Sequence, residues 1–192
     1  MALAYWEKGI EVEPDFADNY RNASKFLSTQ NNHLWTWLYG QAYLALTLEY
    51  GQPDVEAMNV VRKSLFSLFN MSKQTIPKQG LDAKFFDVLT PCGMGGADAE
   101  TLAALEPKLK CFIESWSKDT DRSKNPVFDQ LQQVLALDKL TEFMFWLYGE
   151  TDREEMNAWG AEHAESFNEF STWIFWNGIE FSTEKPFNRL KN

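Results

Sequence analysis

The sequence predicts an all-α fold, on three observations. Helix punctuation recurs along the chain: Pro14 and Pro53 each stand close to acidic residues, as first-turn prolines do. Apolar residues also return at steps of three and four, which is the period of a helix face. One such stripe consists of Met58, Val61, Leu65 and Leu68. Finally, no run of alternating β-branched residues indicates a strand.

In chain order, these signals predict eight helices. The expected ranges are 2–10, 14–28, 33–50, 53–70, 81–89, 98–117, 126–148 and 152–178. Pro107 should kink or split the sixth helix, because proline lacks the N–H that a helix interior uses. Neighbouring helices are expected to run antiparallel.

The 192 residues are expected to form a single compact domain, 1–192, of about seven to eight helices. Eight Trp and fifteen Phe predict an aromatic-rich core or several aromatic anchors on the surface. A subdivision is the alternative: the polar segment 118–125 would then join a helical layer, 1–117, to a C-terminal helical hairpin, 126–192. Neither part alone would bury a large core, which favours the single domain.

A four-residue motif, Trp-Leu-Tyr-Gly, occurs at 37–40 and again at 146–149. The segments upstream of the two copies align poorly, which argues against an internal duplication. We interpret the motif as a packing solution, in which a glycine lets a helix meet a close neighbour.

The net charge of −10 limits the kinds of partner that the protein can bind. Nucleic-acid binding needs a basic face, and anionic membranes repel an acidic protein, so neither is an expected partner. The uncharged stretch 26–48 is too short and too polar to span a bilayer. Cys92 and Cys111 form no disulfide framework and no zinc spacing, and the N-terminus lacks a secretory signal. We therefore expect unpaired cysteines and a cytoplasmic protein.

The most informative feature of the sequence is a concentration of acidic residues towards its C-terminal end. Seven carboxylates and one basic residue, Arg153, lie between Glu150 and Glu169, within the last predicted helix. The helical period places a strip of acids and one aromatic beside the apolar face of that helix. The strip comprises Glu155, Glu162, Glu165, Glu169 and Trp176. It is either a solvated flank or a binding surface for a basic partner.

The apolar face of the same helix should dock on the rest of the protein. It comprises Met156, Trp159, His163, Phe167, Phe170 and Ile174. His163 is therefore expected to be a buried histidine hydrogen-bonded to a neighbour rather than a ligand.

The sequence predicts no catalytic residue, no metal site and no cofactor. Cys92 with His33 or His163 as its base is a conceivable hydrolase pair, but nothing local supports it. The glycine-rich segment 91–96 fits neither the dinucleotide fingerprint nor the P-loop. Paired carboxylates for glycoside hydrolysis have no recognisable cleft around them.

The leading hypothesis is a non-catalytic binding protein that neutralises a basic partner. The profile is similar in physical type to immunity proteins against bacterial toxins and to acidic inhibitors that mimic DNA, although no motif identifies a family. A cytosol-acting toxin such as a nuclease is the expected partner. The alternatives are a helical scaffold or adaptor module, and an enzyme whose site is assembled from scattered residues. The sequence predicts no oligomeric state.

Overall fold

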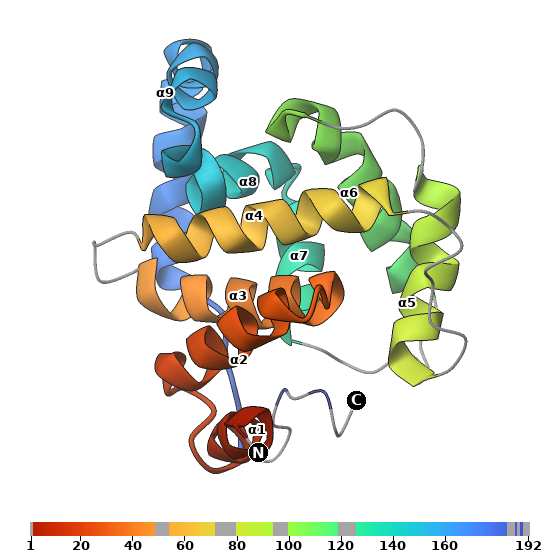
Figure 1. Cartoon of the computed structure of the whole chain (residues 1–192). Helices are drawn as coiled ribbons and strands as arrows, with labels where there is room; N and C mark the ends of the chain where they lie inside the picture. Colours follow the sequence, from red (N-terminus) through yellow and green to blue (C-terminus); the bar gives the residue numbers. More distant parts are fainter. Residues whose placement is uncertain are drawn as a thin grey trace.

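Figure 1 shows the computed structural model of the chain, which describes residues 2–48, 54–71, 80–93, 100–118, 126–183, 187 and 189. The described residues form nine α-helices, which confirms the all-α class. They are α1 (Ala2–Val12), α2 (Ala17–Thr29), α3 (His33–Thr47), α4 (Val55–Asn70), α5 (Gly80–Leu89), α6 (Leu102–Ser117), α7 (Pro126–Ala136), α8 (Leu140–Tyr148) and α9 (Arg153–Trp176). Two 3₁₀ turns, η3 (Thr90–Cys92) and η4 (Gly149–Thr151), follow α5 and α8.

Two boundaries differ from the sequence-based expectation. The predicted helix 126–148 is two helices, because Asp138 takes a left-handed conformation with a φ of 56° and ends α7. In contrast, α6 continues through Pro107, so the helix is not split there, and of the two predicted effects only a kink remains. Pro107 lies in the second turn of that helix, where it removes one backbone hydrogen bond without ending the helix.

Side-chain caps start four of the helices. In each case an oxygen of the residue before the helix accepts a hydrogen bond from a backbone N–H of the first turn, which would otherwise lack a partner. The capping residues are Asn32, Asp54, Thr101 and Asp152.

The centre of the fold is α3, of which twelve of fifteen residues are buried. It packs against α2 on one side and α4 on the other (Figure 1). A Cβ on Gly40 would lie 2.1 Å from Cγ2 of Val61, so only glycine permits this approach of α3 and α4. At the second copy of the motif, a Cβ on Gly149 would lie 2.7 Å from Sδ of Met156. Both motif glycines thus meet a close neighbour, in agreement with the packing interpretation.

An aromatic cluster joins α3, α5, α6 and α7. Neighbouring rings in it have centroids 4.7 to 6.2 Å apart. The cluster consists of Trp37, Phe85, Phe112, Trp116 and Phe128. The aromatic core is therefore shared by residues on both sides of the polar segment 118–125.

Cys92 and Cys111 are joined in a disulfide, with Cα atoms 5.5 Å apart. The expectation of two unpaired cysteines is therefore wrong. The 3₁₀ turn η3 ends at Cys92, Gly93 follows with a φ of 95°, and η3 packs against α6. Disulfides persist in oxidising compartments, so the cysteines no longer support a cytoplasmic location. Separately, no helix in the described part of the chain is long and apolar enough to cross a membrane.

The C-terminal end packs on the N-terminal helices. Phe187 is buried, with its ring 6.0 Å from that of Trp35. Arg189 pairs with the buried carboxylate of Glu7 at 3.0 Å, and the Tyr39 hydroxyl donates to the same carboxylate at 3.1 Å. Glu7 is therefore an acidic side chain of the protein interior, in contrast to the exposed acids of α9.

Candidate binding surface on α9

The longest helix, α9, is mostly exposed. Among its 24 residues only Phe170 and Ile174 are buried. Figure 1 places the helix at one edge of the molecule, where its main packing partners are α8 and η4. A helix held along one side leaves its other side free for contact with a second molecule.

The inner side of α9 carries an aromatic stack. The ring of Trp159 lies flat on that of Phe145 of α8, with centroids 4.2 Å apart and planes 8° apart. His163 covers the other face of Trp159 at 4.8 Å, and its Nδ1 lies 2.8 Å from the Trp159 carbonyl oxygen. His163 is exposed, so its predicted burial is wrong. Met156 and Phe167, also expected to dock, are half-buried.

Glu155 does not belong to the exposed strip. Its carboxylate pairs with Arg62 of α4 at 3.2 Å and accepts the Leu102 N–H of α6 at 2.7 Å. Its side chain is only 15% exposed. The N-terminus of α6 attracts a carboxylate because its first N–H groups lack helical partners. Glu155 therefore ties α9 to α4 and α6, which corrects its predicted place in the strip.

The other three acids of the strip are exposed, as the helical period predicts. Glu162, Glu165 and Glu169 have no ion-pair partner among the residues that the structure describes. Seven residues separate the first from the last, a rise of about 10 Å along the helix. They form an unpaired row of negative charge, which we call the acidic row.

An aromatic pair lies at the C-terminal end of the acidic row. Trp176 is 77% exposed and Phe175 is 54% exposed. Their rings meet edge to face, with centroids 5.1 Å apart. Aromatic side chains are enriched where proteins bind one another.

A groove of about 660 Å³ opens beside this pair. Its walls are one side of α7 and the segment that follows α9. None of the described residues that line it is basic. They are Pro126, Asp129, Gln130, Gln133, Phe175, Trp176, Asn177, Gly178, Ile179, Glu180 and Ser182.

Gln130, on the groove wall, is an unusual residue. It is 3% exposed, and its Nε2 and Oε1, both shielded from solvent, have no hydrogen-bond partner among the described residues. Sequence reasoning missed it, because one glutamine in a helix looks like a solvated residue. The signal that was available is its phase, since Gln130 falls between Val127 and Val134 on the apolar side of α7.

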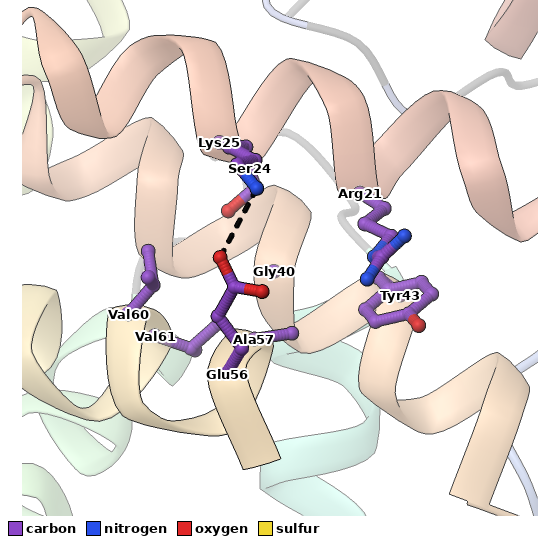
Figure 2. Close-up of a pocket in the computed structure, with 9 residues that line it drawn as sticks. All are labelled: Arg21, Ser24, Lys25, Gly40, Tyr43, Glu56, Ala57, Val60 and Val61. Carbon is purple, nitrogen blue, oxygen red and sulfur yellow. Dashed lines mark hydrogen bonds and ion pairs between the residues drawn. The ribbon is translucent and has the colours of Figure 1, made fainter. Parts of the chain in front are cut away.

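A second hollow, shown in Figure 2, is a packing crevice between α2, α3 and α4. Its volume is about 30 Å³, which is room for about one water molecule. The ion pair between Lys25 and Glu56, at 3.0 Å, spans the crevice at the surface (Figure 2). The crevice results from the close approach at Gly40 and is too small for a ligand.

The structure removes the nucleophile from the conceivable hydrolase pair. The sulfur of Cys92 is bonded to Cys111, so it is not available as a nucleophile. Burial lowers the pKa of His33. No group of three or more His, Cys, Asp or Glu side chains that could hold a metal ion occurs among the described residues. Residues 94–96 of the glycine-rich segment 91–96 lie outside those residues.

No protein-family model, no curated protein and no solved structure matches this chain. The surface of α9 is therefore interpreted from its own geometry.

Proposed function

We propose that this protein is a non-catalytic binding protein that captures a basic protein partner on the exposed side of α9. The observation that carries the proposal is the acidic row, Glu162, Glu165 and Glu169, with the exposed Trp176 at its end. Like charges on adjacent helical turns repel one another, and a cationic partner would offset that cost.

The two parts of the surface are suited to different steps of binding. The field of the acidic row acts at a distance, so it accelerates the encounter with a cationic surface and is weakened by salt. Trp176 acts only after contact, because burying an aromatic side chain slows dissociation.

A partner that fits this arrangement has a positively charged cleft, as nucleic-acid-degrading enzymes do. The proposed role is therefore that of an immunity protein, which occupies the substrate cleft of a nuclease toxin and neutralises it.

The test is surface-plasmon kinetics against a panel of purified basic nuclease domains, at low and high salt. With a bound member of the panel, reversing two charges of the row, Glu162→Lys with Glu169→Lys, should slow association at least about tenfold in low salt. The matched control reverses two exposed acids on other helices, Asp87→Lys with Glu114→Lys, and so has the same net charge.

The control should associate close to the wild-type rate, and Trp176→Ala should change mainly the dissociation rate. Equal slowing by both double variants would show that net charge alone acts. An unchanged rate in the α9 variant would show that the acidic row is only a solvated flank.

A further inference from the structure

Two aromatic rings form a right-angled corner in the groove that lies beside α7. The ring planes of Phe175 and Trp176 are 89° apart, their centroids are 5.1 Å apart, and both side chains line the groove. Because one ring meets the other edge to face, the two ring faces stand perpendicular to each other, and a single bound group can contact both. The residues are 54% and 77% exposed, so the rings keep much of their surface open to such a group.

Ring faces at right angles favour a cation. The face of an aromatic ring is the negative side of its quadrupole, and it attracts a positive charge that lies within about 6 Å of the ring centroid, most strongly for tryptophan. Proteins bind quaternary ammonium groups in cages built from such faces. Phe175 and Trp176 supply two sides of a cage of this kind.

The other walls of the groove also favour positive charge. Asp129 of α7 and Glu180, which follows α9, line the groove with carboxylates, and both residues are exposed. The described lining residues include no Lys or Arg that would repel a cation. The groove also lies at the C-terminal end of α9, which is the negative end of the helix dipole and has no basic residue in its last turn. Aromatic faces, carboxylates and the helix end therefore favour the same sign of charge.

The ring faces further favour an alkylated cation over a simple ammonium group. A primary ammonium group is compact and strongly hydrated, and an aromatic face does not replace its hydrogen bonds to water. A trimethylammonium group has no N–H to satisfy, and its methyl groups leave water when they pack on a ring. The groove volume of about 660 Å³ also leaves room for a polar tail, to which the exposed side chains of Gln133 and Asn177 offer donors and acceptors.

We propose that this groove is a binding site for a trimethylammonium group, held in the corner between Phe175 and Trp176 and attracted by Asp129 and Glu180. The site goes beyond the proposed function and does not depend on it, because the ligand is a small cation and not the face of a nuclease. Two sources offer this group: a free molecule such as choline, and the side chain of a trimethylated lysine in another protein.

The test compares three small molecules by isothermal titration calorimetry with the full chain. Choline carries the trimethylammonium group, its neutral carbon analogue carries a tert-butyl group of the same shape, and ethanolamine carries an unmethylated ammonium group. Choline should bind, and each of the other two should bind at least about tenfold more weakly, because one lacks the charge and the other lacks the methyl groups. In NMR, the methyl protons of bound choline should shift upfield, since they lie over ring faces.

Variants at Trp176 test the aromatic contact. Trp176→Ala should weaken choline binding at least about tenfold, and Trp176→Phe, which keeps a ring face, should recover part of the loss. The matched control is Tyr5→Ala on α1, because Tyr5 is also 77% exposed but does not line the groove. It should bind choline as the wild type does.

A second pair of variants tests the carboxylates. Asp129→Asn with Glu180→Gln should weaken choline binding about threefold or more, because two negative charges leave the walls of the site. Removing two exposed charges elsewhere, by Asp87→Asn with Glu114→Gln, changes the net charge equally and should leave the affinity unchanged.

Four results would overturn the inference: no choline binding by the wild type at millimolar concentration, equal affinity for the neutral analogue, equal affinity for ethanolamine, or unchanged affinity in Trp176→Ala. A peptide containing trimethyl-lysine assigns the source of the group. Tighter binding of that peptide than of choline would support a modified protein, and binding no tighter than that of choline would support a free molecule. The proposed function fails separately, because association of the acidic row with a nuclease is measured without choline.

Discussion

Helices α3 and α9 both contain several aromatic residues, but α3 is buried and α9 is mostly exposed. Twelve of the fifteen residues of α3 are buried, whereas α9 buries two of twenty-four. Both contain tryptophan and phenylalanine or tyrosine, and both have a glycine near the middle, Gly40 and Gly160. However, α3 has no Asp, Glu, Lys or Arg, whereas α9 carries an acidic row beside its aromatic stack. The absence of charge places α3 at the centre, and the one-sided charge of α9 leaves a surface for a partner.

The largest expected effect concerns how α9 is attached. Phe170 is buried against Phe143, with ring centroids 6.2 Å apart, whereas Phe167 is half-buried. Phe170→Ala should therefore destabilise the protein by about 3–5 kcal/mol. Phe167→Ala should cost about 1–2 kcal/mol, because only part of its surface leaves water on folding. Urea unfolding measures both. Equal losses of stability in the two variants would mean that α9 is packed on more than one side, as α3 is.

The two helix glycines provide the next test. A Cβ on Gly40 would lie 2.1 Å from Val61, whereas Gly160 has no atom within 4 Å of the corresponding position. Gly40→Ala should destabilise by about 2–3 kcal/mol through overpacking. Gly160→Ala should stabilise by about 0.5–1 kcal/mol, because alanine favours a helix over glycine. Thermal unfolding of the two variants should shift in opposite directions, and a loss of stability in both would contradict an exposed α9.

The smallest expected effect concerns the loss of folding stability at low pH. Burial alone would raise the pKa of Asp54, but the Ala57 N–H, the Tyr43 hydroxyl and the Arg21 guanidinium outweigh it and lower that pKa. A carboxyl with a lowered folded-state pKa stabilises the protein above its unfolded pKa of about 4, and that stability is lost as the pH falls below this value.

Asp54→Asn retains a capping side chain and should reduce the loss of stability between about pH 5 and pH 2, measured by urea unfolding. Glu165→Gln, on the acidic row, is the matched control and should follow the wild-type pH profile. A flatter profile in the control alone would show that acids of α9, and not those tied to α2 and α4, govern acid unfolding.

Local signals were sufficient to predict the helices, because caps, prolines and apolar periodicity act within a few residues. The break at Asp138 was missed because neither glycine nor proline marks it. The phase of α9 placed Glu162, Glu165 and Glu169 correctly on its exposed side. The same helical period gave the wrong exposure for Glu155 and His163. Their exposure depends on how far α4, α6 and α8 extend along α9.

Features formed by distant segments were beyond sequence reasoning. The disulfide depends on η3 packing against α6, and two cysteines alone contain no pattern that predicts it. The groove depends on the segment after α9 lying beside α7. The burial of the Gln130 amide is likewise visible only once the packing around α7 is known.

The exposure of Trp176 has an optical consequence. The other seven tryptophans are buried or half-buried, so their indole rings are wholly or partly shielded from water, whereas that of Trp176 is not. Its emission should form the red edge of the intrinsic fluorescence spectrum and should be the part most readily quenched by acrylamide. The native protein thus carries its own reporter at the rim of the groove, and a bound molecule covering Trp176 would shift that emission to the blue without any added label.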